Sequence, residues 1–186
     1  MSHTKTKKLV LISLFTAISV VLLMVPFLRF PLIPAAAFLE YDAMDVPILM
    51  GGLLLGPGAG FLITALAAVV QGFTVSSSSG LYGIIMHFIA TGAFVGVSSL
   101  VYRKSHTTKR LVLALILGAL AMTAIMIPAN ILITPIFMGV PRSVVVNMML
   151  PVFIPFNLLK SFINAAVTLF VYAPLRKAIE KSSFLD

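Results

Sequence analysis

Apolar runs fill almost all of this 186-residue chain, and they constrain its fold more than any other feature. Hydrophobic residues make up 60% of the sequence and charged residues only 10%, and the mean hydropathy is +1.14. Soluble domains typically carry about 25% charged residues. One helical crossing of a bilayer takes about 20 apolar residues. We therefore predict an all-α integral membrane protein that folds as one compact bundle over residues 1–186.

Turn-forming residues divide the apolar sequence into six segments. The predicted transmembrane spans are residues 9–28, 46–55, 58–75, 81–102, 111–137 and 152–173. The second span is too short to cross the bilayer upright. It is therefore extended either by residues 42–45 at its start or by residues of Gly56-Pro57-Gly58 at its end, a segment that we interpret as a tight turn. Residues 29–44 form the longest irregular stretch, rich in proline and alanine. Because long ordered loops often bind or gate, this segment is our candidate lid loop.

Basic residues indicate the orientation of the six spans. Three lie in the N-terminal tail, four in the 103–110 loop and three in the C-terminal tail, all on one side of a six-span arrangement. Arg29 and Arg142 fall on the other side, and Lys160 lies within the last span. Cytoplasmic loops retain basic residues, so we predict that both termini are cytoplasmic. Merging residues 46–75 into one helix would place the 103–110 loop outside, so six spans are favoured over five.

Charge and cysteine content exclude several classes of protein. The formal net charge of +8 is spread along the chain instead of forming one patch, which argues against nucleic acid as a partner. Zero cysteines exclude disulfides and thiolate metal sites. The basic N-terminus followed by an apolar run resembles a signal peptide, but the run is longer than a typical signal sequence and more membrane sequence follows it. We therefore interpret residues 9–28 as the first span.

A stripe of polar residues lies at membrane depth in the last span. Asn157, Lys160 and Asn164 are spaced i, i+3 and i+7, which places them on one helix face. Inserting a lysine at the centre of a membrane helix costs roughly 2.5 to 3.5 kcal/mol on insertion scales. We therefore expect this lysine to have a partner in the protein or to bind a ligand. Its depth of about 13 Å, at about 1.5 Å per residue, is large for snorkelling. Two interpretations stay open: the stripe binds a ligand, or Lys160 pairs with Asp45 while the asparagines join helices.

Other polar residues in the spans are further candidates. Asn130 follows Pro128, which we expect to break the fifth span and free backbone groups for a site, although a simple proline kink is the alternative. Gln71 and His87 flank the serine-rich loop between the third and fourth spans, where a histidine more often joins helices than binds a ligand. Asp45 begins the second span, and we expect it to cap that helix.

Motifs of enzymes are absent from the sequence. It contains no Walker loop, no GxSxG, no HExxH and no pair of carboxylates within the predicted spans. We therefore predict no catalytic residue, no metal site and no cofactor. A charged relay through the bilayer, as an ion-coupled pump would need, is also missing. The chain is expected to bind a solute without supplying the energy for its movement.

Several motifs together resemble those of one family of membrane proteins. They are Lys7-Lys8-Leu9-Val10, Asp42-Ala43-Met44-Asp45-Val46-Pro47, Gly56-Pro57-Gly58-Ala59-Gly60, Ala121-Met122-Thr123 and Pro155-Phe156-Asn157-Leu158-Leu159-Lys160. The last is similar to P-F-N-x-x-K and is the most specific, whereas the glycine-proline element alone occurs widely. With these motifs the chain resembles the S components (substrate-binding subunits) of energy-coupling factor (ECF) vitamin transporters, specifically the riboflavin-uptake branch.

This resemblance implies a function in transport. It implies a six-helix bundle in a prokaryotic cell membrane that captures riboflavin from outside beneath the first loop. A transmembrane coupling subunit and two cytoplasmic ATPases would then drive release inside. Asn130, Asn157 and Lys160 match positions that resemble the family's polar contacts to the flavin, with Leu39 a candidate to pack on the ring. Ser13 and Ala17 correspond to the face on which the coupling subunit docks.

The chain departs from the family pattern at two places. Ala67-Ala68 stands in the third span where many flavin members carry Lys-Asn, and His87 stands where an asparagine is expected. Both changes alter the polar lining of the pocket. A modified flavin, FMN or another vitamin therefore remains an alternative ligand. A membrane scaffold protein without transport activity, whose polar stripe only joins helices, is the alternative of a different class.

Overall fold

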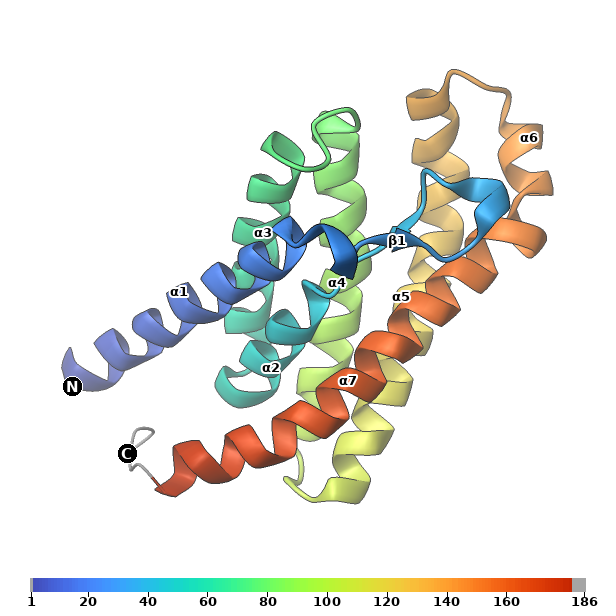
Figure 1. Cartoon of the computed structure of the whole chain (residues 1–186). Helices are drawn as coiled ribbons and strands as arrows, with labels where there is room; N and C mark the ends of the chain where they lie inside the picture. Colours follow the sequence, from blue (N-terminus) through green and yellow to red (C-terminus); the bar gives the residue numbers. More distant parts are fainter. Residues whose placement is uncertain (1, 182–186) are drawn as a thin grey trace.

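The computed structural model describes residues 2–181, with side chains described for residues 5–34 and 36–176 (Figure 1). Its elements are α1 (Ser2–Met24), β1 (Phe30–Pro31), β2 (Glu40–Tyr41), α2 (Asp45–Leu55), α3 (Pro57–Phe73), α4 (Gly80–Tyr102), α5 (Thr108–Met138), α6 (Arg142–Asn147) and α7 (Ile154–Lys181). Turns of 3-10 helix cover Pro26–Leu28 and Pro34–Ala36, and a π-helical turn covers Met149–Phe153. Apart from the two short strands, the regular structure of residues 2–181 is helical, as predicted.

Four helical stretches are long and apolar enough to cross a membrane. They are Lys5–Met24, Gly80–Tyr102, Thr108–Met138 and Met149–Arg176. Helices α2 and α3 are also apolar but have only 11 and 17 residues. At about 1.5 Å per residue, α2 reaches about half of a hydrocarbon layer that is about 30 Å thick. The prediction of a helical membrane protein is therefore confirmed, while the count of six crossings stays a prediction.

The second half of the chain differs from the expected pattern in three respects. Helix α7 continues to Lys181, well past the predicted end of the last span at residue 173. The short helix α6 and the first three residues of the π-helical turn lie between the last two predicted spans, where we expected a loop. Pro128 does not break the fifth span, because α5 runs from Thr108 to Met138 with this proline inside it.

Glycines bring α2, α3 and α4 close together. Gly56 ends α2 with φ 93°, a conformation that favours glycine, and Pro57 then opens α3 where no N–H donor is needed. A Cβ atom on Gly60 would lie 3.1 Å from Cα of Gly52 and 2.6 Å from the Val95 side chain of α4. The predicted turn is therefore confirmed, and a continuous helix over residues 46–75 is excluded.

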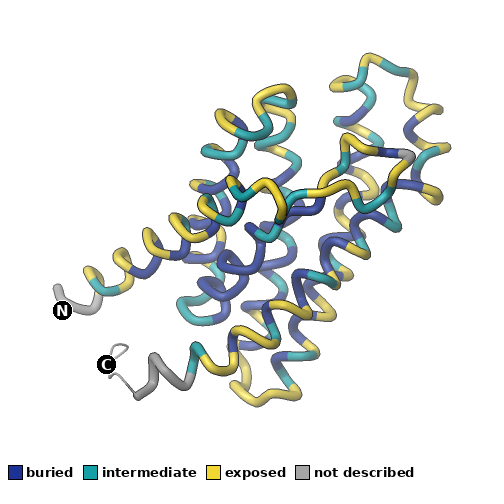
Figure 2. The backbone as a smooth tube through the Cα atoms, viewed as in Figure 1, coloured by how far each residue is buried: buried dark blue, intermediate teal, exposed yellow. Residues whose placement is uncertain are grey.

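The distribution of buried residues fits a bundle in lipid. Figure 2 shows buried residues along the inner faces of the helices and exposed residues along the outer faces. Tyr102, Tyr172 and Phe94 are among the largest side chains that are fully buried. Large apolar side chains such as Phe61 and Phe170 point outward. Soluble monomers rarely expose apolar surface on this scale, so the outer faces are suited to lipid.

Basic residues gather at one end of the bundle. The start of α1, the end of α7, the α2–α3 turn and the α4–α5 loop all lie at this end (Figure 1). Arg176 of α7 donates hydrogen bonds to the hydroxyl of Tyr102 and the backbone oxygen of His106, at 2.5 and 2.8 Å. The first loop, the α3–α4 connection and α6 lie toward the opposite end. The fold therefore separates the basic segments from the polar stripe of α7.

The first loop is a small hairpin. Strands β1 and β2 pair antiparallel, with Phe30 opposite Tyr41 and their ring centroids 5.1 Å apart. Arg29 and Glu40 form an ion pair at 2.5 Å beside this ladder. The hairpin crosses the bundle from the end of α1 toward α6 and returns to α2 (Figure 1). This path brings loop residues over the space between α4, α5 and α7.

Candidate functional site

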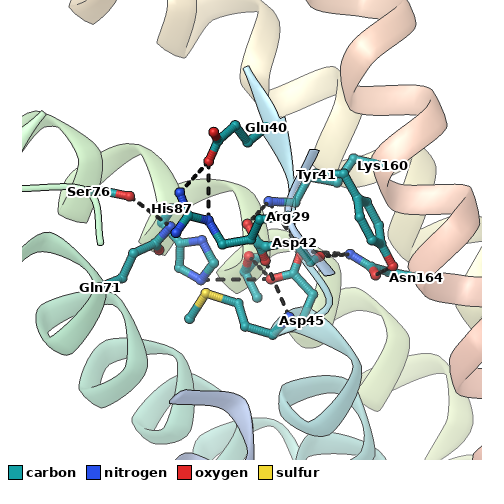
Figure 3. A network of polar contacts seen from close by, with 12 residues as sticks. Arg29, Glu40, Tyr41, Asp42, Asp45, Gln71, Ser76, His87, Lys160 and Asn164 are labelled. Carbon is teal, nitrogen blue, oxygen red and sulfur yellow. Dashed lines mark hydrogen bonds and ion pairs between the residues drawn. The ribbon is translucent and has the colours of Figure 1, made fainter. Parts of the chain in front are cut away.

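A buried ammonium lies beside two carboxylates at the centre of the site (Figure 3). Lys160 Nζ of α7 lies 2.8 Å from Asp42 Oδ2 and 3.9 Å from Asp45 Oδ2. These three side chains are only 9%, 5% and 0% exposed. Because an unpaired charge is strongly unfavourable in such surroundings, the carboxylates explain how the lysine is accommodated. The interpretation that Lys160 has a protein partner is confirmed, but its nearest carboxylate belongs to Asp42 and not to Asp45.

Asn164 joins α7 to the first loop. Its Nδ2 donates to Asp45 Oδ2 at 3.1 Å and to the backbone oxygen of Asp42 at 3.4 Å. Its Oδ1 accepts a hydrogen bond from the hydroxyl of Tyr41 at 2.9 Å. Asn164 is fully buried and lines neither of the two cavities described below. Of the stripe in α7, this residue therefore has the surroundings of a helix-joining amide.

Asp45 does not cap α2. The cap position is occupied by Met44, whose side chain makes no capping hydrogen bond. Asp45 instead accepts a hydrogen bond from Thr91 Oγ1 of α4 at 2.7 Å, besides the bond from Asn164 of α7. The expected capping role is therefore wrong, because partners from two other helices hold the carboxylate.

The charges around the first loop shift two of its ionisable groups. Burial by itself would raise the pKa of the Asp42 carboxyl, but the adjacent Lys160 ammonium and the N–H of Met44 hold that pKa below its ordinary value. Burial raises the pKa of Tyr41 to about 12, and the neighbouring carboxylates of Asp42 and Asp45 add to this effect. Near neutral pH, Asp42 is therefore an anion and Tyr41 a neutral phenol.

Two adjoining cavities open beside this charged cluster. The first, the apolar cavity, is about 180 Å³, and its lining includes the aromatic residues Phe38, Tyr82, Phe137, Phe153 and Phe156. The second, the polar cavity, is about 200 Å³, and its charged lining residues are Arg29, Glu40, Asp42 and Lys160. Asn157 and Met126 border both. Together the cavities fall in the lower part of the range of roughly 300 to 1,000 Å³ that is typical of small-molecule sites.

Two asparagines face the apolar cavity with part of their hydrogen-bonding capacity unused. Asn130 donates to the backbone oxygen of Met126 at 2.7 Å and accepts from Thr134 at 2.9 Å. Asn157 donates to the backbone oxygen of Phe153 at 2.7 Å. A side-chain amide offers two donors and two acceptor lone pairs. Each asparagine is therefore fixed by its own helix and keeps at least one donor and one acceptor for a ligand.

Gln71 and His87 face the polar cavity from α3 and α4. Nε2 of Gln71 donates to Ser76 Oγ at a long 3.4 Å, while its Oε1 is buried without a partner among the described residues. Nε2 of His87 is also buried and unpartnered, because Asp45 Oδ1 at 3.7 Å is too distant for a hydrogen bond. Both residues line the polar cavity, but neither of these two atoms opens on it, and the His87 ring is directed toward Asp45 (Figure 3).

The first loop covers both cavities. Phe38 and Leu39 contribute to the lining of each one. The ring of Phe38 meets that of Phe153 near α7, with centroids 6.4 Å apart. Leu39, which we predicted to contact the ligand, therefore lies in the part of the first loop that covers the cavities.

The residues predicted to dock a coupling subunit lie away from this site. Ser13 and Ala17 are one turn apart on α1, and both are exposed. Phe15, between them, is buried in the core. The pair therefore lies on an outward face of α1 and is separate from the cavities.

Several residues of the site were not predicted from the sequence. Asp42 was noted as the first residue of the Asp42–Pro47 motif but not as the ion-pair partner of Lys160. The aromatic residues of the apolar cavity come from the first loop, α4, α5, the π-helical turn and α7. A lone lysine in the last span combined with acids in an early loop could have indicated the ion pair. No comparable signal marks the aromatic residues among so many apolar ones.

Known proteins resemble this chain along most of its length. A family model described as "ECF transporter, substrate-specific component" matches residues 7–172. The riboflavin transporter FmnP of Bacillus subtilis is 30% identical over 185 residues, covering 95% of this chain and 96% of the relative. The riboflavin transporter RibU of Streptococcus thermophilus is 28% identical over 186 residues, covering 96% and 87%.

The fold agrees with these sequence relationships. A solved structure described as "Structure and mechanism of the S component of a bacterial ECF transporter" matches with a TM-score of 0.80 and 25% identity, covering 94% of this chain and 98% of that chain. The predicted family is therefore confirmed. Its members are components of transporters and not enzymes, which agrees with the sequence prediction. This chain is a membrane protein that belongs to the ECF transporter family as a substrate-specific S component.

Proposed function

We propose that this S component captures riboflavin, or a close relative of it, in the two adjoining cavities. The observation that carries the proposal is the pairing of an aromatic cavity with a polar one, joined at Asn157. Riboflavin has the matching chemistry, since it combines a flat ring system with a hydroxylated chain. Relatives that are 28% and 30% identical over nearly the whole chain are named riboflavin transporters, which supports the same ligand here.

The isoalloxazine ring lies in the apolar cavity in this proposal. Its carbonyls and ring nitrogens, which need both donors and acceptors, face Asn130 and Asn157. Lys160 borders the polar cavity close to Asn157 and adds a charged donor at the same edge of the ring. Leu39 closes over the ring from the first loop, and Gln71 and His87 bind the remainder of the ligand. Asn164 supports Lys160 from behind through the carboxylate of Asp45.

Six crossings with both termini in the cytoplasm form part of the proposal. The basic segments at the start of α1, in the α4–α5 loop and at the end of α7 share one end of the bundle, which favours that end as cytoplasmic. The cavities and the first loop lie toward the opposite end. The site would then open to the outside of the prokaryotic cell membrane, where a vitamin is captured.

The protein partners of this chain are proposed from its membership of the family. We propose that a transmembrane coupling subunit and two cytoplasmic ATPases release the bound vitamin inside the cell. Ser13 and Ala17 offer the docking face, because small side chains let another helix approach closely. Their exposure and their distance from the cavities are compatible with a partner that binds without touching the ligand.

Ligand binding tests the proposal on purified protein. The fluorescence of riboflavin should be quenched when the vitamin is mixed with the purified protein. Protein purified from cells should be yellow because it carries bound flavin. The variant Asn157→Ala should bind riboflavin about 3- to 10-fold more weakly, as expected for one lost hydrogen bond. Thr168→Ala is the matched control, because Thr168 is buried in the same helix and lines neither cavity. If the purified protein is colourless, does not bind riboflavin and binds another vitamin from a panel, the flavin assignment is refuted. The family assignment would not be affected by this result.

A further inference from the structure

A separate cavity lies at the end of the bundle where the basic residues gather, and we call it the basic-end cavity. Its volume is about 190 Å³, and its lining comes from the end of α4, the α4–α5 loop, the start of α5 and the C-terminal part of α7. Leu111 and Tyr172 are buried in its wall, while Ala173 is exposed at its rim. None of the described residues that line it borders the apolar or the polar cavity. The basic-end cavity is therefore distinct from the proposed vitamin site.

Every polar side chain that lines the basic-end cavity can donate a hydrogen bond. These side chains are the hydroxyls of Tyr102 and Thr108, the imidazole of His106 and the guanidinium of Arg176. The guanidinium also carries a permanent positive charge. No carboxylate is present among the described residues of this lining. Donors and a cation without an anion are suited to a ligand with acceptor oxygens and negative charge.

Arg176 is held in position by its neighbours. Its Nη1 donates to the hydroxyl of Tyr102 at 2.5 Å and to the backbone oxygen of His106 at 2.8 Å. Because the Tyr102 oxygen accepts this bond, its own proton is left to donate to another acceptor. The Tyr102 ring packs edge-to-face with the rings of His106 and Tyr172, with centroids 5.0 and 5.6 Å away. The donors are therefore ordered before a ligand arrives, which lowers the entropy lost on binding.

The sequence concentrates positive charge at this end of the bundle. Its basic segments, residues 1–8, 103–110 and 176–186, contain ten lysines and arginines but only two acidic residues. The other three acidic residues of the chain belong to the first loop and the start of α2. Polybasic segments at a membrane surface attract anionic lipids, and basic pockets between transmembrane helices bind their head groups. The charge of this end therefore draws anions toward the basic-end cavity.

The surface beside the cavity favours a lipid over a soluble anion. Ala173 at the rim lies one turn from Phe170, so the two residues share a face of α7. Phe170 is 79% exposed and lies farther from the basic end of the helix than Ala173 does. An acyl chain whose head group occupies the cavity would therefore lie along this apolar face. A soluble phosphate would gain nothing from that surface.

We propose that the basic-end cavity binds the phosphate of an anionic phospholipid, with Arg176 and Tyr102 as donors and an acyl chain packed beside Phe170. In the proposed orientation of the bundle, this lipid belongs to the cytoplasmic leaflet. The site shares no residue with the vitamin site, so the inference does not depend on which vitamin is bound. A lipid held here would join the α4–α5 loop to α7 and stabilise this end of the bundle.

Short-chain lipids test the site on the purified full chain in detergent. Phosphatidylglycerol should raise the melting temperature of the protein, and phosphatidylcholine, whose head group has no net charge, should raise it much less. Arg176→Gln should weaken phosphatidylglycerol binding by about 10-fold or more, as expected for a lost hydrogen bond between charged groups. Arg103→Gln is the matched control, because Arg103 is exposed at the same end and does not line the cavity. At an ionic strength of about 0.15 M, where charges are screened beyond about 8 Å, this control should change the affinity by less than about 2-fold.

A second variant tests the cavity without changing its charge. Ala173→Leu would place a larger side chain at the rim, so it should also weaken phosphatidylglycerol binding. The melting temperature of the lipid-free protein should not fall in this variant, because Ala173 is exposed. Inorganic phosphate carries charged oxygens without an acyl chain, so it should bind far more weakly than phosphatidylglycerol.

Other results would overturn the inference. Equal binding of the two lipids, or equal losses in Arg176→Gln and Arg103→Gln, would show only diffuse attraction to the basic end. Unchanged phosphatidylglycerol binding in Arg176→Gln and Ala173→Leu would place the lipid elsewhere, and inorganic phosphate binding as tightly as the lipid would assign the cavity to a soluble anion. If phosphatidylglycerol has no effect and Arg176→Gln loses the coupling subunit, the cavity receives an acidic side chain of that partner. Riboflavin affinity should be unchanged in all three variants, so a failure of this inference would leave the proposed function intact.

Discussion

Lys160 lies between a carboxylate of the first loop and the polar cavity. Its ammonium holds Asp42 of the first loop, and its side chain also borders the polar cavity. An ion pair of this kind positions both the loop and the donor before a ligand arrives. Preorganised groups bind more tightly because less entropy is lost on association. The structural and ligand-binding interpretations of the sequence are therefore compatible at this residue.

Lys160→Ala tests both roles at the residue scale. Riboflavin affinity should fall by about 1 to 3 kcal/mol through loss of a charged hydrogen bond. The free energy of unfolding should fall by about 3 kcal/mol, because Asp42 and Asp45 would remain buried without the ammonium. Fluorescence titration measures the first quantity and a melting curve in detergent informs on the second. If Asp42→Asn weakens riboflavin binding as much as Lys160→Ala does, the lysine acts only by holding the loop.

Tyr41 provides a prediction about alkaline pH. Its pKa of about 12 in the folded protein exceeds its ordinary value of 10.0, so folding favours the neutral phenol. Its contribution to stability is complete below pH 10 and is lost as the pH rises toward about 12. Absorbance of tyrosinate should show one group titrating near pH 12 that is missing in Tyr41→Phe. The same step in Tyr41→Phe would assign it to another tyrosine.

At the scale of elements, the hairpin of α2 and α3 depends on glycine at a helix contact. Gly60→Val would place side-chain atoms against the Gly52 backbone and the Val95 side chain. Overpacking of this kind typically costs about 1 to 3 kcal/mol, so the melting temperature should fall clearly. Gly58→Val is the matched control, because a Cβ at Gly58 meets no atom within 4 Å. Equal stability of the two variants would contradict the close contact.

The π-helical turn before α7 positions part of the site. Pro151 lies in this turn, where both Val152 and Phe153 donate their backbone N–H to the oxygen of Met148. Phe153 then lines the apolar cavity, and its backbone oxygen accepts the hydrogen bond of Asn157. Such turns occur often at functional sites. The π-helical turn that contains Pro151 therefore sets the start of α7 beside the cavity.

At the scale of the whole molecule, capture and coupling are assigned to separate surfaces. Ser13→Leu should leave riboflavin affinity unchanged, because Ser13 lies on the outer face of α1. It should weaken association with the coupling subunit by about 1 to 3 kcal/mol, since a bulky side chain would overpack a close helix contact. Binding titration, co-purification and vitamin uptake in cells distinguish these effects. Ser13→Ala is the conservative control, and a loss of riboflavin binding in Ser13→Leu would show that the surfaces are not separate.

Properties that depend on local composition could be read from the sequence. The apolar runs and their punctuation predicted a helical membrane protein, and Gly56 with Pro57 predicted the break between α2 and α3. Hydrophobic periodicity and the preferences of turn-forming residues involve only a few neighbouring positions. They can therefore be recognised in the sequence without knowledge of the tertiary structure. Helix α6 was missed because short helices carry little periodic signal, and Pro128 was misjudged because a helix packed in a bundle can continue through a proline.

The sequence by itself determined that a lysine would sit at membrane depth beside two amides on one face of the last helix. Only the tertiary structure decided that Asp42, 118 positions away, neutralises it, that Asn164 binds the carboxylate of Asp45, and that Gln71 and His87 line one cavity. The physical reason is that helical spacing fixes neighbours within one element. Contacts between elements depend on how every helix packs, and no local pattern encodes that packing.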